Sequence, residues 1–175
     1  MMGRMKSRLE WFSLPDIARF LIPYAVVLIG LVLSLIKIPL PLLDLVRPDV
    51  LLMLVYFWAI YRPTFFSPAK IFAVGVLYDL LVGSYIGLSS ILLLLFYVVV
   101  KGQRRFLMAQ NFMVQWLCFA LVTAAKMMVE WGLISLFMWD ITGVVKMALV
   151  MGLTVALFPF FSLLLIQVNK LMENL

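Results

Sequence analysis

The chain has 175 residues, of which 66% are hydrophobic and 13% are charged, and its mean hydropathy is +1.17. Soluble domains carry about 25% charged residues, so this composition excludes an ordinary soluble protein and indicates an integral membrane protein. The net charge of +6 does not indicate nucleic-acid binding, because the basic residues are scattered singly between apolar runs. No linker-like stretch divides the chain, so we expect a single integral membrane domain over residues 1–175.

The side chains that most often act in catalysis or bind metal ions are scarce. Histidine is absent, and the single cysteine, Cys118, lies inside an apolar run. The absence of histidine excludes Ser-His and Cys-His catalysis and His-ligated metal centres. A lone cysteine provides neither a disulfide framework nor a cysteine metal site. We therefore predict no catalytic residue, no cofactor and no metal site.

Six apolar segments are candidates for membrane-spanning helices. A hydrocarbon core of ~30 Å needs roughly twenty residues, and shorter spans are tolerated where packing or local thinning helps. Lipid offers backbone groups no other partner, so we expect every span to be α-helical. The first span follows basic residues, as a signal sequence would, but it is too long for a typical h-region and has no small-residue cleavage pattern. The predicted spans are approximately 17–36, 43–61, 67–82, 86–100, 111–137 and 144–168.

The basic residues orient these spans. If the N-terminus is cytoplasmic, ten Lys and Arg residues lie inside, and only Lys37, Arg47 and Lys146 lie outside. A five-span alternative would need one helix about 50 Å long over residues 67–100 and would reverse the loop that follows it. We therefore predict an all-α polytopic membrane protein, a compact bundle of six transmembrane helices with both termini cytoplasmic. The ten inside residues are Arg4, Lys6, Arg8, Arg19, Arg62, Lys70, Lys101, Arg104, Arg105 and Lys170.

The second span opens with Pro48 and Asp49, directly after Arg47. An Arg and an Asp two positions apart do not share a helix face, so they are not expected to pair along the helix. We expect Asp49 to cap the start of this span, where a negative charge favours the helix dipole.

The third span contains the most unusual charge. Asp79 lies in a ladder with Gly75, Gly83 and Gly87 at four-residue intervals. An Asp at the centre of a membrane helix costs about 2.5 to 3.5 kcal/mol, so it needs a partner or a function. Residues four apart share a helix face, and glycines there allow another helix to approach closely. We expect a helix-packing surface, in which Asp79 bonds either within the bundle or to a partner.

The third and fourth spans are both short, and residues 83–87 join them. We expect a tight hairpin whose tip barely reaches the outer surface and leaves a shallow depression there. Lys101, Arg104 and Arg105 follow the fourth span as a basic cytoplasmic loop. This loop is expected to set the topology and contact anionic lipid, with docking of a cytoplasmic protein as the alternative.

The fifth span contains Lys126 and Glu130, one helical turn apart. They can neutralise each other as an internal ion pair facing the bundle, although Lys before Glu is the weaker orientation. In the alternative, Lys126 reaches Asp79 and leaves Glu130 near the outer interface. Neither arrangement resembles a proton relay, which needs a longer chain of titratable groups.

Two segments together resemble a known family. RPDVLLMLVY at 47–56, followed by GVLYDLLVGSYIG at 75–87, resembles the rod shape-determining MreD family of bacterial inner-membrane proteins. The predicted span count, chain length and topology agree with this resemblance. It also implies a fold similar to the six-helix substrate-binding subunits of energy-coupling-factor vitamin transporters. The family-like positions are Pro48, Asp49, Gly75, Asp79, Gly83 and Gly87; the Lys126 and Glu130 pair is inferred from the residues alone.

The resemblance implies a non-enzymatic scaffold of the bacterial elongation complex, or elongasome, in the cytoplasmic membrane. Such a scaffold binds MreC, a single-span protein, and helps organise lateral peptidoglycan synthesis and rod shape. Through MreC it would associate with the MreB filament, the RodA glycosyltransferase and its penicillin-binding transpeptidase. The resemblance implies no nucleic-acid partner.

Two other functional classes fit the sequence less well. A substrate-binding subunit of a vitamin transporter often carries an Ala-xxx-Ala pattern in its first span, whereas here Ala18 is followed four residues later by Ile22, and Ala25 by Ile29. A membrane enzyme is least favoured, because the chain lacks histidine, a cysteine pair and clustered acids.

Overall fold

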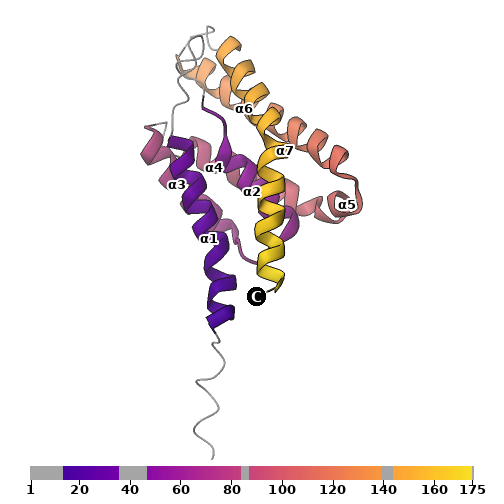
Figure 1. The fold of residues 1–175 in the computed structure, drawn as a ribbon. Helices are drawn as coiled ribbons and strands as arrows, with labels where there is room; N and C mark the ends of the chain where they lie inside the picture. Colours follow the sequence, from indigo (N-terminus) through magenta and orange to yellow (C-terminus); the bar gives the residue numbers. More distant parts are fainter. Residues whose placement is uncertain (1–13, 36–46, 84–86, 139–143, 175) are drawn as a thin grey trace, which may run out of the picture.

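The computed structural model describes residues 14–35, 47–83, 87–138 and 144–174, and these residues form seven α-helices and no β-strand (Figure 1). Each of the six predicted spans overlaps one of the six longer helices, so the all-helical fold class is confirmed. The seventh helix, α5, is short. The helices are α1 (Leu14–Leu35), α2 (Val50–Tyr61), α3 (Pro68–Val82), α4 (Leu88–Gly102), α5 (Arg104–Ala109), α6 (Phe112–Met138) and α7 (Val144–Asn174).

Two helices are long and apolar enough by themselves to cross a bilayer. The qualifying windows are Phe112–Leu133 in α6 and Met147–Met172 in α7. The other helices in the described residues are shorter or less uniformly apolar, so six crossings remain a prediction. The N-terminal residues 1–13, which were placed in the cytoplasm, lie outside the described part of the chain.

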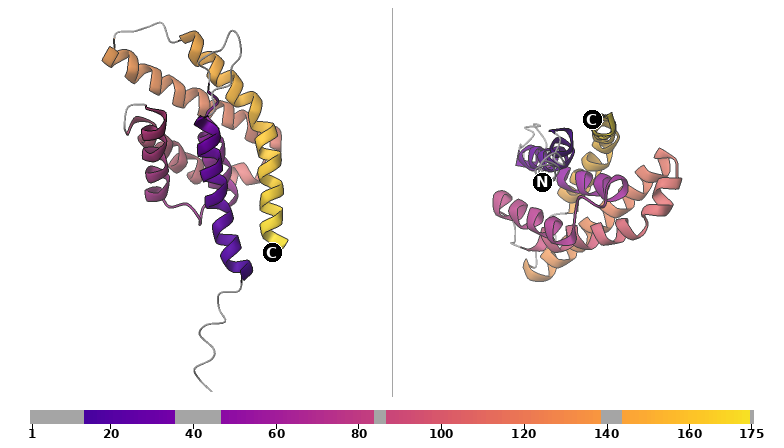
Figure 2. Two further views of the ribbon diagram at one scale, coloured as in Figure 1. Left: turned by 60° about the vertical axis from the view of Figure 1, so that its left-hand side comes forward. Right: turned by 90° about the horizontal axis from the view of Figure 1, so that it is seen from below.

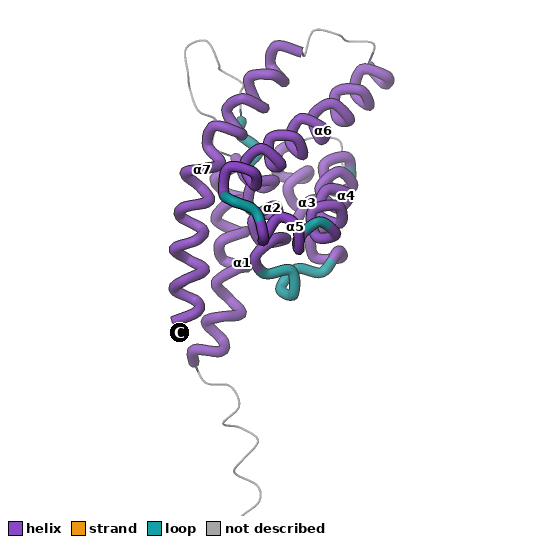
Figure 3. The backbone as a smooth tube through the Cα atoms, turned by 90° about the vertical axis from the view of Figure 1, so that its right-hand side faces the viewer, coloured by secondary structure: helices purple, strands orange, loops and turns teal. Residues whose placement is uncertain are grey.

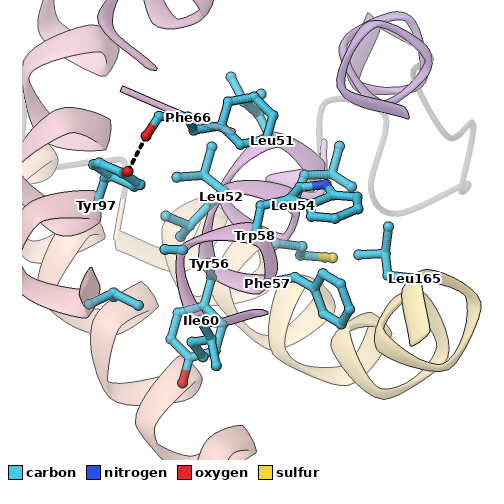
Figure 4. Packing of buried hydrophobic residues seen from close by; sticks show 14 of the residues in the cluster. Leu51, Leu52, Leu54, Tyr56, Phe57, Trp58, Ile60, Phe66, Tyr97 and Leu165 are labelled. Atoms are coloured by element: carbon cyan, nitrogen blue, oxygen red, sulfur yellow. Dashed lines mark hydrogen bonds between the residues drawn. The ribbon is translucent and has the colours of Figure 1, made fainter. Parts of the chain in front are cut away.

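Helix α2 forms the centre of the bundle. All residues from Val50 to Ile60 are buried, with exposed fractions of 4% or less. Figure 4 shows side chains pointing from α2 in every direction, with Trp58, Phe57 and Tyr56 on different sides of the helix. A helix that is hydrophobic all round is stable only where other elements enclose it. Helices α1, α4, α5 and α7 provide this enclosure.

An aromatic cluster joins α2 to the long helices α6 and α7. The rings of Phe119 and Phe158 stack with centroids 4.0 Å apart, and Tyr56 meets their edges at 5.1 and 5.6 Å. The Tyr56 hydroxyl donates to the Gln115 carbonyl oxygen at 2.8 Å. Offset and edge-on ring contacts of this kind add about 0.5 to 1.5 kcal/mol each beyond area burial. They keep α6 and α7 packed on α2.

Helices α3 and α4 form an antiparallel hairpin beside α2 (Figure 2). Ser67 caps α3 by accepting from the Lys70 amide, and Pro68 occupies the first turn, where proline favours the start of a helix. Gly83 ends α3 at φ +71°, and Gly87 precedes α4 at φ +97°. Glycine adopts these left-handed conformations without the steric cost of a Cβ atom.

Two local features differ from the sequence predictions. Helix α2 begins at Val50 instead of residue 43, because Pro48 and Asp49 provide its start; residues 43–46 lie outside the described part. The predicted basic loop contains α5, which is held by a hydrogen bond from Arg104 Nε to the Ile60 carbonyl oxygen at 2.5 Å. Leu107, 3% exposed, packs α5 into the core.

Candidate functional site

A buried ion pair joins two predicted site residues that are far apart in the sequence. Lys126 Nζ of α6 lies 2.5 Å from Asp49 Oδ2, and the two side chains are only 6% and 7% exposed. The interior of a protein screens charges poorly, so this pairing offsets part of the large cost of removing both charges from water. It ties α6 to the N-cap residue of the central helix.

Asp49 connects three helices. Its Oδ1 accepts from the Leu52 amide at 3.0 Å, which is the predicted cap of α2. Its own amide donates to Thr154 Oγ1 of α7, also at 3.0 Å. Together with the bond to Lys126 of α6, these contacts fix α2, α6 and α7 at one point. Both carboxylate oxygens and the amide of Asp49 are therefore used.

Glu130 occupies the edge of this site. Its Oε2 lies 3.4 Å from Lys126 Nζ, and its side chain is 29% exposed. The predicted contact between Lys126 and Glu130 is thus present, but the closer acid is Asp49, and Lys126 does not reach Asp79. We call Asp49, Lys126, Glu130 and Thr154 the Asp49 cluster.

Sequence reasoning missed the pairing of Asp49 with Lys126 because 77 positions separate them. The sequence contained one signal that could have indicated this pair. Lys126 is the only basic residue within the predicted fifth span. A buried ammonium requires a nearby acid, and Asp49 begins the span that turned out to be central.

Asp79 is fully buried and holds the two helices of the hairpin together. Its Oδ2 accepts from the Gly87 amide at 2.9 Å, the Ser90 amide at 3.4 Å and the Ser90 hydroxyl at 3.0 Å. These donors lie at the start of α4, where backbone amides without an intrahelical acceptor and the helix dipole favour a carboxylate. Among the described residues, Oδ1 has no hydrogen-bond partner.

The glycine ladder serves two purposes. A Cβ atom on Gly75 would lie 2.6 Å from Ser90 Cα, so the contact between α3 and α4 requires glycine there. A Cβ on Gly83 or Gly87 would meet nothing within 4 Å, and these positions instead require glycine for their positive φ. The ladder therefore combines one close helix contact with a turn.

The basic residues after α4 do not converge on one group. Lys101 is exposed, with its Nζ 5.5 Å from the centre of the Tyr97 ring. Arg104 bonds to the end of α2, whereas Arg105 is exposed. Tyr97 donates from its hydroxyl to the Phe66 carbonyl oxygen (Figure 4). These contacts anchor the end of the bundle opposite the Asp49 cluster.

Two apolar grooves open on the surface of the bundle. One, of about 150 Å³, lies between α1 and α7 over the central helix. The other, of about 280 Å³, lies between α6 and α7 and is lined by methionines, alanines and Trp131. Neither is lined by a charged side chain. Within the described residues no group of three or more His, Cys, Asp or Glu side chains gathers where a metal ion could bind.

Residues 16–168 match the sequence pattern of a family described as rod shape-determining protein MreD. The matched range covers most of the 175 residues. The chain belongs to the MreD family. Pro48, Asp49 and the Asp79 hairpin all lie inside the matched range. No curated protein and no solved structure matches the chain. Family membership identifies it as a membrane protein related to cell shape.

Proposed function

We propose that this MreD family member is a non-enzymatic, multi-pass scaffold of the elongation complex in the bacterial cytoplasmic membrane. It binds the transmembrane helix of an MreC-like single-span protein and thereby helps organise lateral peptidoglycan synthesis and rod shape. Its links to the MreB filament, the RodA glycosyltransferase and the penicillin-binding transpeptidase are indirect. Six helices cross the bilayer with both termini in the cytoplasm, and the basic residues of α5 contact anionic lipid.

The observation that carries this proposal is the complete burial of α2 within a protein of the MreD family. Side chains fill the space around α2, Lys126 and Asp49 pair across helices, and Asp79 accepts from Ser90 of the neighbouring helix. A rigid bundle of this kind suits a protein that positions another. A vitamin-binding subunit needs an enclosed pocket with a few converging polar groups. The two larger grooves are open and apolar, which disfavours the transporter alternative.

The groove between α1 and α7 is our candidate docking surface for the partner helix. These helices run side by side in Figures 1 and 3, and α2 packs against both. Gly30 lets α1 approach α2, because a Cβ there would collide with the Leu54 side chain. The groove is lined by Val26, Ile29, Gly30, Leu33, Leu54, Phe161, Leu164, Leu165 and Val168.

Shape decides whether a helix binds in this groove, because lipid is as apolar as the groove itself and association depends on close packing. The ladder residues are already engaged within the α3–α4 hairpin, and we assign them to helix packing in the protein's own fold. The partner contact is assigned to the α1–α7 groove instead.

Filling the groove should prevent partner binding. Ile29→Trp and Leu164→Trp place indoles in it, and we expect each to reduce recovery of a co-expressed MreC-like protein at least several-fold. The matched controls are Leu28→Trp and Leu163→Trp, neighbouring residues with exposed fractions of 57% and 60% that do not line the groove. The measurement is affinity purification in mild detergent followed by quantification of the partner.

The controls separate docking from folding. All four variants should elute from size exclusion as the wild type does, and only the groove pair should lose partner. Equal recovery with all four would exclude this groove. Native mass spectrometry of the same samples tests the alternative. A tightly bound vitamin would identify the protein as a transporter subunit and contradict the scaffold proposal.

A further inference from the structure

The hairpin of α3 and α4 is too short for the bilayer that the two long helices match. Each has 15 residues and is therefore about 22 Å long at the standard rise. The hydrocarbon core is about 30 Å thick. Helices α6 and α7, with 27 and 31 residues, reach about 40 and 46 Å. Figures 1 and 3 show both continuing past the end of α3 and the start of α4.

Two lysines mark the end of the hairpin that we expect at the cytoplasmic membrane surface. Lys70 lies in the first turn of α3 and Lys101 in the last turn of α4, so two exposed lysines lie at the same end. Lys70 Nζ donates to the Tyr24 hydroxyl at 2.6 Å and to the Phe65 carbonyl oxygen at 3.2 Å. Lysines near helix ends place their charges at the interface. Measured from there, the other end falls about 8 Å short of the opposite surface.

The two described ends of the turn, Gly83 and Gly87, are held close to α3. Asp79 accepts from the Gly83 amide through its carbonyl oxygen at 3.0 Å and from the Gly87 amide through Oδ2 at 2.9 Å. Both ends of the turn are therefore bonded to one residue in the last turn of α3. Tilting the hairpin would shorten its reach along the membrane normal and increase the mismatch.

The outer face of the hairpin is apolar up to its tip. Leu80, Leu81 and Ile91 are 57%, 49% and 61% exposed, so this end needs acyl chains around it. Helix α2 is even shorter, at 12 residues, but it is enclosed by protein and imposes nothing on lipid. Glu130, 29% exposed, is a carboxylate that would be costly beside full-thickness hydrocarbon.

We propose that the α3–α4 hairpin thins the bilayer beside it, drawing phospholipid headgroups of the outer leaflet down to the level of Leu81. The interaction surface is the exposed face formed by Leu80, Leu81 and Ile91, and its partner is the lipid of that leaflet. This inference rests on the membrane-spanning topology of the proposed function, but not on any protein partner. Thinning costs fractions of a kcal/mol per Å of mismatch, which the buried contacts of the hairpin can offset.

The test is spin-label depth in vesicles that contain the purified protein alone. Nitroxides are attached to single cysteines at Leu81, Leu95, Ala69 and Leu163, each in a Cys118→Ser background. Collisions with a water-soluble nickel complex and with oxygen report the depth of each label. We expect the nickel-to-oxygen ratio at Leu81 to exceed that at Leu95 several-fold and to remain the same in short-chain and long-chain phosphatidylcholine. The Leu163 label on α7 should become deeper as the chains lengthen.

An oxygen-dominated reading at Leu81 in long-chain lipid would overturn the proposal. So would a hydrocarbon reading at Ala69, because the hairpin would then be displaced toward the outer surface instead of thinning the bilayer. Correct elution of each labelled protein confirms that it is folded. Recovery of the MreC-like partner is measured in a separate experiment. If no partner is recovered but the Leu81 label still lies at the membrane interface, the scaffold proposal is wrong and the thinning proposal stands.

Discussion

Lys126→Met is expected to destabilise the protein by about 3 to 5 kcal/mol, because it leaves Asp49 charged and buried without its partner. The Asp49 carboxylate is 7% exposed and lies 2.5 Å from the ammonium that the substitution removes. The unpaired charge would also disturb the start of α2, whose first amides depend on Asp49. Thermal unfolding of the purified protein in detergent should show a large fall in midpoint temperature.

Two companion variants separate the ion pair from general damage at this site. Asp49→Asn combined with Lys126→Met removes both charges and keeps an oxygen for the Leu52 amide, so it should recover most of the lost stability. Glu130→Gln should change stability by less than about 1 kcal/mol, because its contact is longer and partly exposed. If the double variant were no more stable than Lys126→Met alone, the pair would not be the cause.

Asp79→Leu is expected to separate the α3–α4 hairpin and lower stability by several kcal/mol. Three donors, namely the Gly87 amide, the Ser90 amide and the Ser90 hydroxyl, would lose the oxygen that accepts from them. Each buried donor left without a partner costs about 1 to 3 kcal/mol. Asp79→Asn keeps one carbonyl oxygen, so it should lose much less.

The comparison of the two Asp79 variants distinguishes hydrogen bonding from charge. Ser90→Ala removes one donor and leaves both backbone amides, so its effect should fall well below that of Asp79→Leu. Unfolding midpoints of the three variants in detergent provide the measurement. Equal losses for Asn and Leu would mean that the negative charge is required, and the hydrogen-bonding explanation of Asp79 would be wrong.

Local sequence signals predicted the helices well. Ser67 and Pro68 mark the start of α3 at the position observed, and the family-like segments lie within the range that matches the MreD pattern. These signals act over a few residues, so they can be read directly from the sequence. The same reasoning missed α5, because a six-residue helix is stabilised by tertiary contacts such as the one between Arg104 and Ile60.

The pairings between distant helices were harder to predict. Asp49 was expected to cap its own helix, and it does, but its second role depends on Lys126 lying opposite it in space. Asp79 was expected to bond either within the bundle or to a partner protein. Which of these occurs depends on how close Gly75 lets α4 approach α3. Composition and spacing do not specify which helices become neighbours, since many arrangements of six apolar helices bury similar area.

No local sequence pattern predicted the central position of α2. Its run from Val50 to Ile60 is apolar on every face, which suits both a lipid-exposed span and a span enclosed by protein. In the structure α2 is enclosed by protein, and α1 and α7 lie outside it. The proposed docking groove depends on that arrangement.

Photo-crosslinking in native membranes tests the scaffold proposal most directly. A photoreactive residue is placed at Ile29 or Leu164 in the groove, or at Leu28 or Leu163 beside it, and the adducts are identified by mass spectrometry. We predict an adduct with a single-span MreC-like protein from the two groove positions and not from their neighbours. Absence of that adduct at both groove positions, with the protein expressed and folded, would contradict the proposed docking surface. An adduct of equal yield at all four positions would contradict it as well.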